Sequence, residues 1–235
     1  MPHIDVELDR LKTKLLEMWD LVEYQVQSGR DAMLTADTEL AKAIIKRDRK
    51  VNRFDIKIDR MCENFFALFT PVAVDLRMVL AVLKINANLE RIGDTAEGIA
   101  RFAKKLEAPV APELLELTNV LPMYEEALAM LAECRTAFKN NDTELAKAII
   151  KRDKKLDKIY RKSDQVVTKY MMDNPAKIHE ALAVLSIIKK VERVGDQVTN
   201  IAEEVIFYRD AKIVKHKDDK KKKKDSKKDP NKDQQ

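Results

Sequence analysis

One twelve-residue segment occurs twice in this chain, and the repeat constrains the fold more than any other feature. Residues 37–48 and residues 142–153 both read DTELAKAIIKRD, at an offset of 105. Further along each copy, ERIGD at 90–94 corresponds to ERVGD at 192–196, at an offset of 102. The chain is therefore an internal duplication. Features that both halves keep are better guides to function than a motif that occurs once.

The spacing of apolar residues predicts helices in both halves. Apolar residues recur three and four positions apart almost throughout, which is typical of amphipathic helices, and no alternating strand pattern occurs. Asp37 and Asp142 are suitable N-caps, and Pro122 is expected to kink the helix that contains it. The six apolar seams run over Ile4–Val26, Leu40–Leu68, Val82–Ala103, Leu117–Leu131, Leu145–Tyr170 and Val184–Val205. The predicted fold is all-α, with two tandem three-helix bundles related by the duplication.

Composition separates a nearly neutral body from a basic tail. The formal net charge is +5, but residues 212–235 contain eleven Lys and five Asp, so the rest of the chain is close to −1. We therefore expect three parts, namely a first repeat at 1–108, a second repeat at 109–211 and a disordered tail at 212–235. The tail is either a solubilising extension or a weak, nonspecific contact to an anionic membrane surface or nucleic acid. A body of this charge predicts no specific nucleic-acid contact.

Segment lengths and cysteine usage favour a soluble cytoplasmic protein. The N-terminal MPHIDVELDR carries charges where a signal peptide is apolar. The longest strongly apolar run, Ala181–Ile188, is less than half of the roughly 20 residues that a membrane-spanning helix needs. Cys62 and Cys134 both lie in helical patterns, so we expect two buried free thiols rather than a disulfide framework.

Carboxylates line one side of the predicted helices in both halves. Asp48, Asn52, Asp55 and Asp59 follow one another at spacings of four, three and four, each one position past the apolar seam. Asp153, Asp157, Tyr160 and Asp164 repeat this track in the second half. The next helix of each half adds a pair four residues apart, Glu90/Asp94 in the first and Glu192/Asp196 in the second. Side chains four residues apart lie on one face of a helix.

Counting residues back from the turn between the two helices of each half predicts which positions lie opposite each other. Asp48 should lie opposite position 95, and Asn52 opposite position 91. Asp153 should lie opposite position 195, and Asp157 opposite position 191. Each half therefore brings four polar side chains together, and these eight residues are the candidate site. Asp55 lies opposite position 88, and its counterpart in the second half is Tyr160, so Asp55 is a weaker candidate. The other weaker candidates are Asp59, Asp164 and Asn200.

Two interpretations of these sets remain open. The neighbouring arginines Arg47, Arg91, Arg152 and Arg193 could pair with the carboxylates, as surface charges on helices usually do. Against this, Gly93 and Gly195 occur inside both pairs although glycine in a helix costs roughly 1 kcal/mol. A packed helix or hydrated ions must approach the backbone there. We favour metal binding.

The ligand types restrict the metal and the chemistry. His3, His179 and His216 lie outside the stripes, His179 reads as a helix-surface residue, and the Glu-x-x-His pattern of di-iron bundles is missing. Oxygen ligands alone favour Fe, Mn, Mg or Ca over tetrahedral zinc. The sequence has no glycine-rich phosphate loop and no nucleophile–base pair, so no enzymatic activity is predicted.

Longer segments resemble the PhoU family of cytoplasmic regulators of bacterial phosphate uptake over about residues 4–210. The segments are RDRKVN, RDKKLD, FTPVAVDLRMVLAVLK, NLERIGDTAEGIA, YMMDNP and KVERVGDQVTNIAEEVIFY. The resemblance implies paired three-helix bundles that hold multinuclear metal clusters, iron among them. It also implies damping of the phosphate-starvation response, between a phosphate ABC transporter ATPase subunit and a sensor histidine kinase, often as a homodimer.

Carried over by position, the resemblance assigns Asp153/Asp157 with Glu192/Asp196 as one motif pair and Asp48/Asn52 with Glu90/Asp94 as the other. Asn52 departs from the family pattern because it replaces a carboxylate with an amide, and the Lys-rich tail is not part of that pattern. Two alternatives to a regulatory adaptor stay open. One is a metal-dependent hydrolase or metal-storage bundle, and the other is a structural bundle with ion-paired stripes.

Overall fold

The computed structural model describes residues 2–212, and these residues form helices without a strand. In chain order the elements are α1 (Pro2–Thr35), α2 (Thr38–Leu68), α3 (Ala73–Ala103), α4 (Pro112–Thr118), α5 (Val120–Asn140), α6 (Thr143–Asp173), the short 3₁₀ helix η1 (Pro175–Lys177) and α7 (Ile178–Asp210). The predicted all-α class is confirmed. Apart from Lys212, the predicted tail lies outside the described residues.

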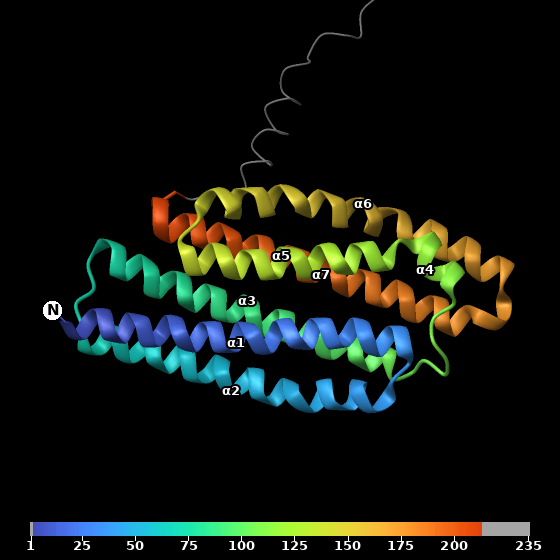
Figure 1. Cartoon of the computed structure of the whole chain (residues 1–235), viewed down its shortest axis with the longest axis horizontal. Helices are drawn as coiled ribbons and strands as arrows, with labels where there is room; N and C mark the ends of the chain where they lie inside the picture. The colour runs from blue at the N-terminus through green and yellow to red at the C-terminus, as the bar shows by residue number, and fades with distance from the viewer. Residues whose placement is uncertain (1, 213–235) are drawn as a thin grey trace, which may run out of the picture.

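The helices form two bundles that lie side by side along their length (Figure 1). Helices α1, α2 and α3 make the first bundle, and α4 to α7 make the second. Helices α3 and α7 run antiparallel through the middle, where the bundles meet. Arg77 Nε donates to the Tyr208 carbonyl at 3.3 Å, and Lys84 pairs with Glu204 at 3.1 Å across this contact. The predicted boundary at residues 108 and 109 falls in the segment between α3 and α4.

The repeated DTEL segment starts a helix in the same way in both halves. The Leu40 N–H donates to Asp37 Oδ1 at 2.9 Å, and the Leu145 N–H donates to Asp142 Oδ1 at 2.9 Å. An aspartate that accepts from the third residue of the helix satisfies one of its otherwise unpaired N–H groups. Both predicted N-caps are confirmed, and they fix where α2 and α6 begin.

The second half differs from the first in the short helix η1 and in a break of its first helix. The sequence predicted a single helix kinked at Pro122, but the structure has two helices, α4 and α5, separated at Asn119, whose φ is 53°. Proline has no N–H to donate to the carbonyl four residues earlier, which here belongs to Thr118. Thr118 is the last residue of α4. The missing hydrogen bond therefore ends the helix instead of bending it, and Pro122 sits in the first turn of α5.

Most of the predicted apolar seams form the core. The predicted seam residues of α3 and α7 are buried, among them Val82, Leu89 and Ala103 on α3 and Val184, Val194 and Val205 on α7, and the core runs continuously through both bundles. The prediction was wrong for Leu68, which is 76% exposed because it is the last residue of α2, and for Leu117, which is 47% exposed near the end of α4. Cys62 and Cys134 are buried free thiols as expected. None of the helices in residues 2–212 is both long and apolar enough to cross a membrane.

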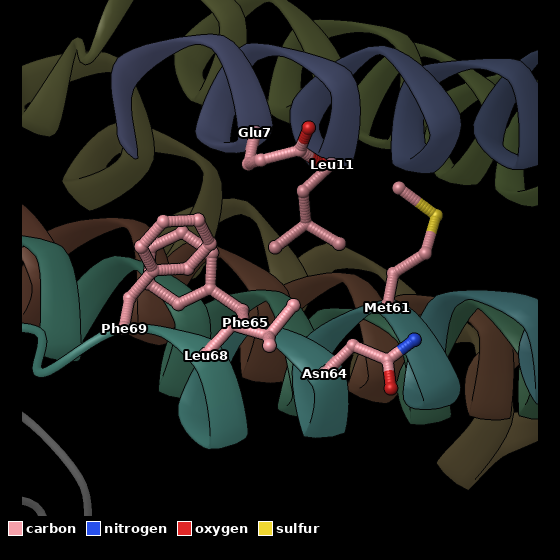
Figure 2. Close-up of a pocket in the computed structure, with 7 residues that line it drawn as sticks. All are labelled: Glu7, Leu11, Met61, Asn64, Phe65, Leu68 and Phe69. Carbon is pink, nitrogen blue, oxygen red and sulfur yellow. The ribbon is translucent and has the colours of Figure 1, made fainter. Parts of the chain in front are cut away.

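A small cavity lies at the outer end of the first bundle, between the start of α1 and the end of α2. Figure 2 shows its lining, which comes from Glu7, Leu11, Met61, Asn64, Phe65, Leu68 and Phe69. Its volume is about 90 Å³ and most of these side chains are apolar. It holds none of the candidate metal ligands, so it plays no part in the site below.

Candidate metal centres

The first carboxylate set lies between α2 and α3. Asp48 is only 7% exposed, and its Oδ2 accepts from Asn52 Nδ2 at 3.1 Å. Its other oxygen, Oδ1, is buried without a hydrogen-bond partner. Burial raises the pKa of Asp48, and the nearby charges of Asp94 and Glu97 raise it further. Burial and the charges of Asp94, Asp55 and Asp48 likewise raise the pKa of Glu90.

The second set lies between α6 and α7 and carries more charge. Burial first, and then the charges of Asp196, Asp157 and Glu192, raise the pKa of Asp153 to about 7. Burial and the neighbouring carboxylates also raise the pKa values of Glu192 and Asp196. Asp153 Oδ1 is buried without a partner, like Asp48 Oδ1 in the first set. Both halves thus hold one buried, unsatisfied carboxylate oxygen at the same repeat position.

The predicted register between the helices is confirmed in both halves. A Cβ built on Gly93 would lie 3.6 Å from Asp48 Oδ1, and one built on Gly195 would lie 2.9 Å from Asp153 Oδ1. Asp48 was expected opposite position 95 and Asp153 opposite position 195. Asp48 and Asp153 therefore each lie beside the glutamate–aspartate pair of the next helix, and the assignment of all eight residues to two metal sites stays a prediction.

The two glycines have an explanation that requires no ion. The same Cβ on Gly93 would lie 3.0 Å from Val51 Cγ1, and that on Gly195 would lie 2.6 Å from Leu156 Cδ2. Real Cβ atoms essentially never come within 2.6 Å of carbon, and 3.0 Å is tighter than most contacts, because interiors are packed to contact. Packing of the neighbouring helix is thus a sufficient reason for glycine at position 195 and a weaker one at position 93. The inference from glycine to metal was too strong, and the unsatisfied oxygens are the better argument.

Two of the four arginines beside the carboxylates have other partners, whereas Arg91 and Arg193 oppose the rise in the pKa values of the neighbouring Glu90 and Glu192. Arg152 donates to Glu126 at 2.7 Å and to Glu133 at 2.6 Å, both on α5, and Arg47 stacks over the Tyr24 ring at 4.2 Å. Within residues 2–212, the one salt bridge made by the eight candidates joins Asp157 to Arg161 at 3.2 Å, with the Arg161 side chain 76% exposed. Local ion pairing therefore leaves the buried oxygens of Asp48 and Asp153 unsatisfied.

The sequence reasoning missed Lys190, which the second half contributes to the first set. Its ammonium end occupies the space that a Cβ on Gly98 would need. Burial and Arg193 lower the pKa of Lys190, while Glu97 and Asp94 oppose that shift. A cation next to Asp94 reduces the negative charge available to an ion there. Gly98, which lies one turn beyond Asp94, was the available signal, since it marks a close approach.

The weaker candidates are arranged differently in the two halves. Asn86 of α3 is fully buried and donates to Asp55 Oδ1 at 2.7 Å and to Asp59 Oδ1 at 3.0 Å. The sequence did not single out Asn86, although it lies one turn before Glu90. In the second half Ile188 and Tyr160 replace Asn86 and Asp55. Asp164 is exposed and Asn200 half-buried, and no hydrogen bond within residues 2–212 joins either to the second set.

The donor set fits an oxygen-preferring cation, but it is not closed around one. Buried carboxylate oxygens without partners are costly and attract a counter-charge. Among residues 2–212, however, no three His, Cys, Asp or Glu side chains converge tightly enough to make a ready metal site. Side chains would have to move to complete either set, and in the first set Asn52 and Asp94 are exposed. His179 is exposed at the start of α7 and far in sequence from both sets.

Comparison with known proteins gives a consistent result. The PhoU domain family matches residues 15–103 and again residues 120–205, once in each half. The phosphate-specific transport system accessory protein PhoU of Serratia marcescens is 34% identical over 215 residues, covering 91% of this chain and 87% of that protein. The protein of that name in Escherichia coli is 33% identical over 215 residues, covering 91% of this chain and 88% of its own length.

Solved structures agree in three dimensions. The crystal structure of PhoU from Pseudomonas aeruginosa superposes with a TM-score of 0.83 at 32% identity, covering 88% of this chain and 99% of that one. The phosphate transport system regulatory protein PhoU from Streptococcus pneumoniae superposes with a TM-score of 0.81 at 30% identity, covering 90% and 99%. These similarities extend over both bundles.

Proposed function

This chain belongs to the PhoU family, and from that premise we propose that it is a cytoplasmic regulator of phosphate uptake. Its relatives are named as accessory or regulatory proteins of phosphate transport. In this proposal the chain contacts the ATPase subunit of a phosphate ABC transporter and a sensor histidine kinase. It acts as a non-enzymatic adaptor that damps the phosphate-starvation response, as a homodimer. The family match over both halves carries this part of the proposal.

The proposal includes metal at the two carboxylate sets. Its support is one observation made twice, the buried oxygens Asp48 Oδ1 and Asp153 Oδ1, each without a hydrogen-bond partner. Asp153, Asp157, Glu192 and Asp196 would hold the ion of the second half, and Asp48, Asn52, Glu90 and Asp94 that of the first. Iron, manganese, magnesium or calcium would suit these oxygen donors. When bound, the ion neutralises the carboxylates and ties α6 to α7, or α2 to α3.

A chelator-controlled pull-down tests the adaptor function. The full chain is presented to the transporter ATPase subunit and, separately, to the cytoplasmic part of the kinase, with and without metal. We expect both partners to be retained by the wild-type chain with Mn²⁺ or Fe²⁺. The variant E192A/D196A is the metal-deficient arm, and E113A/E116A on the exposed surface of α4 is the charge-matched control. Failure of the wild-type chain to retain either partner would contradict the proposal.

The four carboxylates of the second set also leave a second candidate function open, that of a metal-dependent hydrolase or a metal store. Hydrolysis needs a cleft beside the metal to hold substrate. The cavities at the start of α1, beside η1 and beside α4 are lined by none of the eight candidate residues. Turnover of a phosphate ester by the metal-loaded chain, lost in E192A/D196A, would favour this candidate over the adaptor.

A further inference from the structure

A groove on the outside of the second bundle has features that the regulatory function does not use. It lies where α4 ends beside α6, and its volume is about 390 Å³. Leu117, Thr118 and Asn119 line one side, and residues of α6 line the other. Figure 1 shows α4 resting against α6 at this place. No acidic side chain lines the groove, although the helix itself is rich in both charges.

Three lysines of α6 line this groove. Lys155, Lys158 and Lys162 are exposed and follow at spacings of three and four, so they share one helix face. Lys155 pairs with Glu126 at 3.2 Å, but within residues 2–212 neither Lys158 nor Lys162 forms a salt bridge. Two ammonium groups without a salt bridge, next to a third that shares Glu126, produce a positive potential that a concave surface concentrates. The groove therefore selects for an anion.

The shape and floor of the groove restrict the kind of anion. From Lys155 to Lys162 the helix rises by roughly 10 Å, so a single phosphate group cannot reach all three lysines. Ile159 and Val166 are half-buried in the floor, and Leu117 is 47% exposed at its edge. An apolar floor beside a charged row suits a ligand with a flat apolar body and an elongated anionic part.

The helix break supplies a further contribution at the edge of the groove. Asn119 lies in the groove lining and is also the N-cap of α5, a helix of 21 residues whose first turn no side chain caps. The N-terminus of a helix carries partial positive charge and directs free N–H groups outward. This adds to the attraction by the lysines without being the basis of it.

The first bundle carries the same charges beside an unbroken helix. Lys50, Arg53 and Lys57 occupy the repeat positions of Lys155, Lys158 and Lys162, and they are exposed. There, α1 is one continuous helix of 34 residues. Its Lys14 lies over the ring of Phe54, the counterpart of Ile159, with the ammonium 5.6 Å from the ring centroid. The helix break at Asn119 is thus peculiar to the second bundle, and the first bundle is a natural control.

We propose that the groove formed by Leu117–Asn119 and the lysines of α6 binds a small organic polyphosphate, such as a nucleoside polyphosphate. The phosphate chain lies along Lys155, Lys158 and Lys162, and the organic body lies against Leu117, Ile159 and Val166. This site is separate from both carboxylate sets and does not depend on the regulatory role. No covalent step is involved.

Calorimetric titration of the metal-free full chain tests this site. The probes are ATP, tripolyphosphate, inorganic phosphate and adenosine, each at the same ionic strength. We expect ATP to bind more tightly than tripolyphosphate, inorganic phosphate to bind at least about tenfold more weakly than ATP, and adenosine to give no measurable heat. Equal affinity for ATP and inorganic phosphate, or no binding of ATP, would overturn the proposal.

Matched triple variants separate the groove from general charge attraction. K155Q/K158Q/K162Q and K50Q/R53Q/K57Q remove the same charge from equivalent positions, and the basic tail is common to both. We expect only the first variant to weaken ATP binding, by at least about tenfold, and we expect K155R/K158R/K162R to retain ATP binding. Equal weakening of ATP binding by both Gln variants, or no weakening by the first, would contradict ATP binding in the groove. Unchanged melting of each variant, followed by circular dichroism, excludes misfolding as the cause.

Discussion

The two carboxylate sets have the same backbone arrangement but different charges. In both, the aspartate that ends the repeated DTELAKAIIKRD segment lies against a glycine of the next helix and has one unsatisfied oxygen. In the first set Asn52 donates to Asp48 and Lys190 lies nearby. In the second set Asp157 replaces the amide and raises the pKa of Asp153.

This difference shows how a duplicated site can diverge without a change of fold. The packing of Val51 on Gly93 and of Leu156 on Gly195 preserves the position of the helices. One amide and one lysine then decide how much negative charge the position holds. Because repulsion between carboxylates is relieved by a cation, the second set should bind metal more tightly than the first.

Removing the pair on the second helix of each set should produce the largest effect. We expect E192A/D196A to abolish the tighter class of Mn²⁺ binding, and E90A/D94A to abolish only the weaker class, because each deletes two of four donors. Calorimetry of Mn²⁺ into metal-free protein measures both. If E192A/D196A leaves the tighter class in place, the site assignment is wrong.

Next in size is an effect on the metal-free protein. The pKa of Asp153 is about 7 in the folded chain against an ordinary 3.8, so the folded state keeps a proton that the unfolded state releases between these values. Stability should therefore fall as pH rises from 4 to 7 and stay low above that. We expect D153N to stabilise the metal-free chain by about 2 kcal/mol at pH 8, after allowance for solvent screening, with little change near pH 4.

Urea unfolding at pH 4, 6 and 8 in the absence of metal measures this effect. The matched variant D48N should stabilise less, since an amide already hydrogen-bonds Asp48. A D153N chain that is less stable than wild type at pH 8 would mean that the carboxylate is favourably solvated, contrary to the account.

The smallest expected difference concerns the two glycines. A Cβ at position 195 would lie 2.6 Å from Leu156 Cδ2, whereas one at position 93 would lie 3.0 Å from Val51 Cγ1. Overpacking costs about 1–3 kcal/mol, and alanine recovers about 1 kcal/mol of helix propensity. We expect G195A to lower the free energy of unfolding by about 1 kcal/mol and G93A to leave it almost unchanged. Equal losses in thermal melting would show that the closer packing around Gly195 is not significant.

The repeat made much of this structure predictable. Helix starts at Asp37 and Asp142 follow from side-chain capping, and the level of Asp48 against Gly93 follows from counting across a turn, because both depend on local geometry. The position of the α4–α5 break did not follow, since Pro122 acts on the carbonyl of Thr118 and ends the helix at that residue. A seam pattern alone does not report such an interruption.

The sequence predicted which carboxylates lie near one another, but it did not predict which other side chains surround them. Spacing brought Asp153, Asp157, Glu192 and Asp196 together, because positions four apart share a helix face. Lys190 and Asn86 were missed because their partners belong to other helices, and only the packing of α3 against α7 and of α2 against α3 brings them close. The fate of Arg152 was also unpredictable, since its partners Glu126 and Glu133 lie on α5.

Exchange of the one differing ligand tests the central claim most directly. Calorimetric titration of Mn²⁺ into the metal-free wild type, N52D and D157N measures the dissociation constants. We expect two classes of site in the wild type, about tenfold tighter Mn²⁺ binding by the first set in N52D, and weaker binding by a similar factor at the second set in D157N. A single class of sites in the wild type, unmoved by either exchange, would contradict it.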